Sequence, residues 1–92
     1  MESSFEDAVV DVIERIPPGE TVTYGEVADE AGFPGAARAV GNTLRTVPGL
    51  PWWRVITATG RLVPGLEADH AHRLRAEGVS VLNGRVAMRE TR

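Results

Sequence analysis

The 92-residue sequence contains no cysteine. This absence excludes a disulfide scaffold, a cysteine-based zinc site and a thiol nucleophile. The chain also has no apolar run near the ~20 residues that a membrane-spanning helix needs, and residues 1–6 are acidic where a signal peptide would be basic. We therefore expect a cytoplasmic protein, associated with the nucleoid if its source is bacterial.

Lysine is absent as well, so all ten basic residues are arginines. The net charge of −3 conceals an uneven distribution. Residues 1–30 carry nine acidic side chains against Arg15 alone, whereas residues 31–92 carry nine arginines against four acids. This asymmetry indicates an N-terminal part that avoids phosphate and a remainder that attracts it.

The length of the chain limits it to a single domain, residues 1–92, because so short a sequence cannot build two cores. Hydrophobic residues make up 42% of it, enough for one small core. No internal repeat and no linker divides it. No dimerisation element is evident either, so we expect a monomer.

Capping signals and apolar periodicity predict four helices. Ser3 and Glu6 form one capping box and Thr23 and Glu26 form another. The predicted helices cover residues 3–16, 23–31, 36–47 and 67–76. The second and third are joined by a glycine-containing turn, a spacing typical of a helix-turn-helix.

Two β features are predicted after the third helix. Residues 54–57 are predicted as a short strand, and residues 79–88 as a hairpin turning at Asn83-Gly84, which suits a type I′ turn. The predicted hairpin places Val79, Val81, Val86 and Met88 on one face. The fold class is therefore mainly α with small β, in the layout of a winged helix-turn-helix DNA-binding domain.

The third helix carries a polar face. Its core positions are predicted to be Ala37, Val40, Leu44 and Val47, with Arg38, Asn42 and Arg45 on the opposite side and Gly41 between them. Glycine within a helix costs about 1 kcal/mol relative to alanine. Close approach of DNA would explain it, and so would packing of an ordinary amphipathic helix against a neighbour; spacing alone does not separate the two.

The chain's two tryptophans are adjacent, at Trp52 and Trp53. On an extended segment they would point to opposite sides. One reading makes them a core anchor and its cap, and the other makes them the wall of a pocket for a flipped base. Tyr24 has a similar pair of readings, as a core contact or as a hydroxyl presented to phosphate at a helix N-terminus.

His70 and His72 are the only histidines, and they are two residues apart on a predicted helix. That spacing places them on roughly opposite sides, with no third strong ligand nearby. We therefore predict no metal site and no cofactor.

Four segments together resemble one known family. They read Ile-Pro-Pro-Gly at 16–19, Thr-Tyr-Gly-Glu-Val-Ala at 23–28, Ala-Ala-Arg-Ala-Val-Gly at 36–41 and Pro-Trp-Trp-Arg-Val-Ile at 51–56. In this order and spacing they look like the DNA-binding domain of O6-alkylguanine-DNA alkyltransferases, over about residues 5–78. In those enzymes the segment at 51–54 reads Pro-Cys-His-Arg, and the cysteine accepts the alkyl group. With Trp52 at that position, the chain resembles the alkyltransferase-like branch, which is not enzymatic.

The resemblance implies a function and partners. Alkyltransferase-like proteins bind double-stranded DNA containing O6-alkylguanine, flip the base and flag it for nucleotide excision repair proteins. Tyr24 would then help to rotate the 3′ phosphate, and Arg38 would be the finger that enters through the minor groove. Trp52 would line the lesion pocket and Arg54 would fix the loop.

The resemblance also implies a departure at Trp53. In the enzymes a glutamate matching Glu77 orients the catalytic histidine, but here Trp53 occupies the histidine position, so Glu77 is expected to lose that partner and to be structural. No catalytic residue is predicted. The predicted DNA contacts are Tyr24, Arg38, Gly41, Asn42 and Arg45, and the predicted lesion pocket is Tyr24, Trp52, Trp53 and Arg54.

Two alternatives remain at this point. A winged-helix transcription factor would read undamaged sequence in the major groove. A protein-interaction module would use the acidic first helix and would not need DNA.

Overall fold

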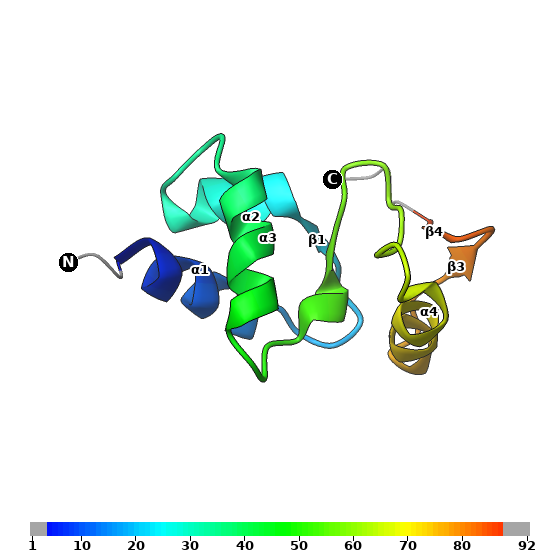
Figure 1. The fold of residues 1–92 in the computed structure, drawn as a ribbon. Helices are drawn as coiled ribbons and strands as arrows, with labels where there is room; N and C mark the ends of the chain where they lie inside the picture. Colours follow the sequence, from blue (N-terminus) through cyan, green and yellow to red (C-terminus); the bar gives the residue numbers. More distant parts are fainter. Residues whose placement is uncertain (1–3, 88–92) are drawn as a thin grey trace.

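The computed structural model describes residues 4–87 and is mainly helical (Figure 1). In chain order the elements are α1 (Ser4–Glu14), β1 (Val22–Thr23), α2 (Tyr24–Ala31), α3 (Ala37–Thr46), the 3-10 helix η1 (Trp52–Arg54), β2 (Val55–Ile56), α4 (Glu67–Ala76), β3 (Val81–Leu82) and β4 (Arg85–Val86). Within these residues the strands form two sheets of two strands each. None of the helices in this range has the length and apolar character needed to cross a membrane.

The predicted boundaries of α2 are confirmed by its caps. Thr23 Oγ1 accepts a hydrogen bond from the Glu26 N–H at 3.1 Å, and Glu26 Oε1 accepts one from the Thr23 N–H at 2.9 Å. Gly32 ends the helix with its N–H on the carbonyls of the preceding turn. The reciprocal bonds satisfy backbone donors that a helix start leaves free, which is why the sequence pattern located this helix correctly.

The first helix is shorter at its end than predicted. It stops at Glu14 because the next two N–H groups bond to carbonyls three residues back, Arg15 to Val12 and Ile16 to Ile13. Such bonds tighten a last turn instead of continuing an α-helix. The predicted N-cap Ser3 lies outside the described residues.

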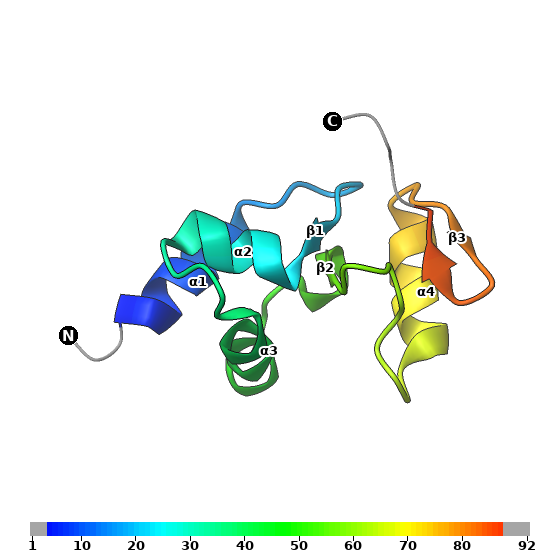
Figure 2. The ribbon, with the colours of Figure 1, turned by 90° about the horizontal axis from the view of Figure 1, so that it is seen from above.

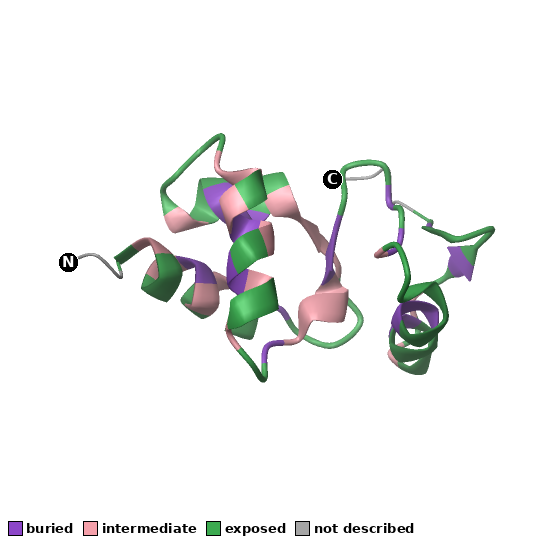
Figure 3. Ribbon diagram, in the orientation of Figure 1, coloured by how far each residue is buried: buried purple, intermediate pink, exposed green. Residues whose placement is uncertain are grey.

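Buried side chains gather in two clusters (Figure 3). The first lies among α1, α2, α3 and β2 and consists of Val9, Ile13, Ile16, Val27, Ala28, Val40, Leu50 and Val55. The second lies among β2, α4 and the hairpin and consists of Ile56, Leu62, Ala71, Leu74, Val81 and Val86. Residues 4–87 therefore contain two adjoining centres of hydrophobic packing where one core was expected.

Strand β2 joins the two clusters. It pairs in parallel with β1, Val22 opposite Val55 and Thr23 opposite Ile56. Successive side chains on a strand point to opposite faces, so Val55 enters the first cluster and Ile56 the second. Viewed from above, β1 and β2 lie between the three N-terminal helices and α4 (Figure 2).

The C-terminal hairpin confirms the predicted turn. Asn83 and Gly84 both have positive φ, 54° and 75°, as a type I′ turn requires. Val81 pairs with Val86, and both are buried in the second cluster. The paired strands are shorter than the predicted range, and Met88 lies outside the described residues.

Candidate nucleic-acid interface

An open cavity of about 570 Å³ lies between α3, the start of α2, η1 and the segment before α4. Its lining residues are Tyr24, Ala37, Arg38, Gly41, Leu44, Arg45, Trp52, Val63 and Leu66. The lining is mainly apolar, with two guanidinium groups and, among these nine residues, no carboxylate. A site of this kind accommodates a flat apolar group without repelling phosphate.

Five of the predicted site residues meet at this cavity: Tyr24, Arg38, Gly41, Arg45 and Trp52. Three others do not line it. Asn42 is directed along the helix surface, where its Oδ1 accepts a hydrogen bond from Arg45. Trp53 and Arg54, assigned to the pocket from the sequence, instead turn their polar atoms to Glu77, which corrects that placement.

The side of α3 that faces the cavity includes residues that the apolar pattern of the helix assigned to the core. Ala37 and Leu44, predicted as core, are half-buried and line the cavity. Thr43 is buried instead, and its Oγ1 donates to the Ala39 carbonyl at 3.2 Å. This bond within the helix satisfies the hydroxyl and allows a polar residue to occupy a core position.

Val63 and Leu66 were not predicted as site residues. They lie in a loop, where no helical or strand period marks a side chain as facing a site. Leu66 is 47% exposed although it is large and apolar. The one sequence signal that could have found them is the occurrence of apolar residues on both sides of Pro64-Gly65, where a surface loop is usually polar.

Arg38 is exposed on α3, and the described part of the chain gives its guanidinium no hydrogen-bond or ion-pair partner. Gly41, one turn further on, has room for a side chain. A Cβ built on Gly41 would lie 3.9 Å from Cε1 of Tyr24, an ordinary contact distance. Packing within the described residues therefore does not require glycine here.

Tyr24 lies between the first cluster and the cavity. Its ring is half-buried against the first cluster and also lines the cavity. Burial raises the pKa of the hydroxyl, although the nearby charge of Arg45 acts in the opposite direction. The phenol consequently stays protonated and can donate a hydrogen bond at the cavity.

The tryptophan pair lies on a 3-10 turn and not on an extended segment, and the strand predicted over residues 54–57 is confined to Val55–Ile56. The Arg54 N–H donates to the Pro51 carbonyl at 3.1 Å, and this bond closes the turn. The two indole rings meet edge to face, with centroids 6.0 Å apart and planes at 87°. Of the two, only Trp52 lines the cavity. Its ring also packs against the ring of His70, with the two centroids 5.0 Å apart.

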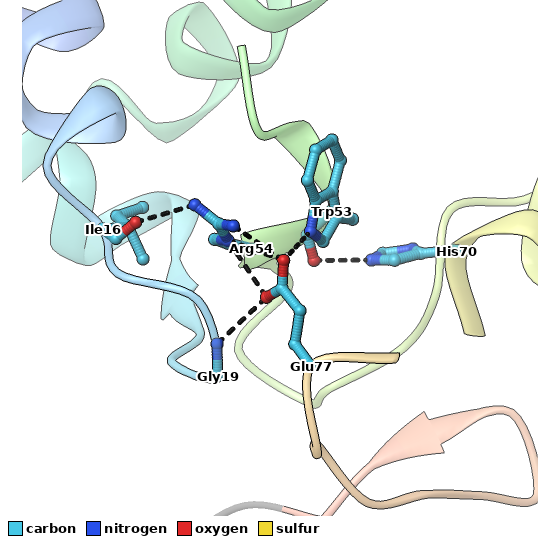
Figure 4. A network of polar contacts seen from close by, with 6 residues as sticks. All are labelled: Ile16, Gly19, Trp53, Arg54, His70 and Glu77. Carbon is cyan, nitrogen blue, oxygen red and sulfur yellow. Dashed lines mark hydrogen bonds and ion pairs between the residues drawn. The ribbon is translucent and has the colours of Figure 1, made fainter. Parts of the chain in front are cut away.

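Glu77 is the centre of a polar network (Figure 4). Its carboxylate accepts hydrogen bonds from Arg54 Nη2 at 2.7 Å, from the Trp53 indole Nε1–H at 2.8 Å and from the Gly19 N–H at 3.0 Å. Arg54 also donates through Nη1 to the Ile16 carbonyl at 2.9 Å. Arg54 thereby ties the loop after α1 to η1.

Glu77 keeps a hydrogen bond to the residue at position 53, although the indole N–H of Trp53 is a donor only and cannot relay a proton. The hydrogen bonds from Arg54, with those from Gly19 and Trp53, lower the pKa of Glu77 to about 2 against the effect of burial. Gly19 must approach closely for its bond: φ is +93°, and a Cβ there would lie 3.3 Å from the Glu77 carbonyl oxygen.

His70 is fully buried beside the cavity. Its Nδ1 accepts a hydrogen bond from the Val63 N–H at 3.1 Å, and its Nε2 lies 3.0 Å from the Trp53 carbonyl oxygen, to which Nε2–H donates. Burial lowers its pKa. His72 is exposed on another side of α4, and residues 4–87 contain no group of three or more potential metal ligands.

Comparison with known proteins decides the family. Residues 4–79 match the family model described as 6-O-methylguanine DNA methyltransferase, DNA binding domain. The chain is also 44% identical over 85 residues to the DNA base-flipping protein of Vibrio parahaemolyticus, covering 86% of this chain and 85% of that protein. The chain is an alkyltransferase-like protein of this family.

Further relatives and solved structures support the same family assignment for this alkyltransferase-like protein. The Escherichia coli DNA base-flipping protein is 42% identical over 86 residues, covering 87% of this chain and 66% of that one. The crystal structure of S. pombe Atl1 in complex with damaged DNA containing O6-carboxymethylguanine superposes with a TM-score of 0.82 at 32% identity, covering 97% and 91% of the two chains. Mycobacterium tuberculosis OGT in complex with DNA gives a TM-score of 0.73 at 40% identity; the match covers 80% of this chain and 48% of OGT.

Proposed function

We propose that this alkyltransferase-like protein is a non-enzymatic sensor of DNA damage that binds duplex DNA and flips O6-alkylguanine into the cavity beside Trp52. The observation that carries the proposal is the cavity itself, which joins Tyr24, Arg38 and Trp52 around a mainly apolar space. Relatives named DNA base-flipping protein and the complex of Atl1 with damaged DNA support it.

The DNA-binding part of the proposal uses α2 and α3 as a helix-turn-helix and the β3–β4 hairpin as its wing. Arg38, Asn42 and Arg45 lie on the exposed side of α3 and supply contacts to phosphate and groove. Gly41 allows the duplex to approach the helix, since the protein's own packing leaves space there. The cavity then opens on the DNA side of α3.

The free-energy cost of flipping a base is small enough to be offset by binding contacts in such a site, with no chemical reaction. Extruding a base costs a few kcal/mol, and less where pairing is already weakened. Arg38 enters through the minor groove and fills the vacated place, which offsets part of the cost. Stacking or apolar contact with Trp52 adds roughly 1–3 kcal/mol. Val63, Leu44 and Leu66 offer the alkyl substituent an apolar surface.

The bound lesion is retained and not repaired. Alkyl transfer needs an activated nucleophile, and the chain has no thiol at any position. Trp53 cannot act as a base either, because an indole N–H donates a hydrogen bond and accepts none. The protein, as a monomer, therefore marks the site for nucleotide excision repair proteins.

The experiment that tests this proposal measures the affinity of the protein for one duplex with and without a single O6-methylguanine. We expect tighter binding to the modified duplex, and for both duplexes an affinity that falls as salt rises, because arginine contacts to phosphate release counterions. Equal binding to the two duplexes would favour a transcription factor that reads undamaged sequence. Failure to bind either duplex would favour an interaction module.

A further inference from the structure

The two walls of the cavity are linked to each other through one side chain. Trp52 forms one wall, and Val63 and Leu66 form the other. His70 bonds to both segments. Its Nδ1 accepts a hydrogen bond from the Val63 N–H. Its Nε2–H donates to the carbonyl of Trp53, the residue after Trp52 (Figure 4). Its ring also packs against the Trp52 indole at 5.0 Å.

We propose that His70 is a positioning residue that fixes the separation of the two cavity walls and so sets the preference for damaged over undamaged DNA. The inference rests on the proposed function, because it concerns the fit of the flipped base in the same cavity. His70 does not line the cavity and acts through its contacts with Trp52, Trp53 and Val63.

The neutral ring is required for this role. One nitrogen accepts a hydrogen bond and the other donates one, which only a neutral imidazole protonated at Nε2 can do. A second proton on Nδ1 would face the Val63 N–H, and the bond to that wall would be lost. Burial already disfavours the charged form.

Charged side chains lie near His70 on α4 and on η1. On α4 these are Asp69, which favours the charged ring, and Arg73, whose guanidinium lies over the Trp52 and Trp53 rings. On η1 it is Arg54, which is paired with Glu77. Residues 62–66, which form the other side, carry no charged side chain.

Glutamine is the informative replacement. Its carboxamide presents an oxygen acceptor and an N–H donor with a separation similar to that of the two ring nitrogens, and it does not titrate in the working pH range. His70→Gln therefore tests the two bonds without the charge, and His70→Leu removes both bonds while retaining apolar bulk. His72→Gln, an exposed change on the same helix, is the matched control.

The measured quantity is the ratio of affinities for a duplex with one O6-methylguanine and for the same duplex unmodified. At neutral pH we expect His70→Gln and His72→Gln to keep the wild-type ratio within about twofold, and His70→Leu to lower it about tenfold, the effect of one or two lost buried hydrogen bonds. Affinity for the unmodified duplex changes little, because phosphate contacts supply it. A folded His70→Leu protein with the wild-type affinity ratio would overturn the proposal. So would a His70→Gln protein whose affinity ratio falls by as much as that of His70→Leu.

A second measurement decides the case if His70→Leu does not fold. The affinity ratio is followed as the pH is lowered from neutral, over the range in which wild type and His70→Gln both remain folded by circular dichroism. The wild-type ratio is expected to fall relative to that of His70→Gln, and parallel curves would overturn the proposal. A wild-type protein that does not discriminate between the duplexes at neutral pH would refute the proposed function instead, so the two failures are distinct.

Discussion

The indole N–H of Trp53 donates a hydrogen bond to Glu77 at 2.8 Å, across 24 residues of sequence. The pair keeps a donor beside the glutamate but contains no group that can pass on a proton, because an indole nitrogen has no acceptor lone pair. Glu77 instead holds η1 against the loop at Gly19. Its geometry suits the positioning of Trp52 rather than the activation of a nucleophile.

The first prediction concerns alkyl transfer. Incubation with duplex carrying a labelled methyl group on guanine O6 is expected to leave the protein unlabelled, since no thiol is present. Scintillation counting of the separated protein measures this. Label on the protein in stoichiometric amount would refute the sensor proposal. Trp52→Cys is expected to remain inactive too, because Trp53 cannot deprotonate the new thiol.

The second prediction concerns Arg38. Arg38→Ala is expected to weaken binding of the O6-methylguanine duplex by roughly 1–3 kcal/mol, because the gap left by the flipped base is no longer filled. The melting temperature stays unchanged, since the side chain is exposed and has no partner within the described residues. Arg15→Ala, at an exposed arginine that directly follows α1 and pairs with Asp11, is the control and leaves lesion binding intact. A lower melting temperature with unchanged affinity would assign Arg38 to the fold alone.

The third prediction concerns Trp52. In a Trp53→Phe background, the fluorescence of Trp52 is expected to change more on adding damaged duplex than on adding plain duplex. Trp52→Ala in that background then lowers the preference for damaged DNA by roughly 1–3 kcal/mol, the value of one stacking contact. Affinity for plain DNA falls much less. If only the melting temperature drops, Trp52 is a packing residue and the lesion binds elsewhere.

The fourth prediction concerns Glu77. Glu77→Gln is expected to destabilise the fold by about 2 kcal/mol, because Arg54 is left without its charged partner in a largely buried site. Chemical denaturation measures this, with the exposed Glu14→Gln as control.

The same network has a pH signature. The pKa of Glu77 is lowered from 4.5 to about 2, so its contribution to stability is complete above pH 4.5 and is lost as the pH falls from 4.5 towards 2. Glu77→Gln removes this part of the acid dependence. Wild type and Glu77→Gln losing stability in parallel over that interval would contradict the role given to the carboxylate.

The sequence predicted those parts of the fold that depend on local chemistry. The capping box at Thr23 and the type I′ turn at Asn83 arise from bonds and dihedral angles a few residues apart, and both are confirmed. Residues 67–76 were likewise predicted as a helix with the bounds observed. By contrast, the 3-10 turn at Trp52 was missed, and the strand predicted over residues 54–57 begins one residue later because Arg54 belongs to that turn.

The candidate site was predictable only in part, for a similar reason. Residues on α3 were found because helical spacing reveals which side chains share a face. By contrast, Val63 is held beside the cavity by a hydrogen bond to His70, and Glu77 accepts a hydrogen bond from Gly19, which is 58 residues away in the sequence. Contacts between distant loops leave no period in a sequence, so only the folded chain reveals them.

The arrangement of β2 has a mechanical consequence for the bound state. Val55 and Ile56 belong to different clusters, so the two-residue strand β2 connects the two halves of the described chain. The cavity is lined by α2 and α3 on one half and by Val63 and Leu66 on the other. In the proposed complex, a base in this cavity would contact both halves at once and would add a connection to those that Glu77 and His70 already make with η1.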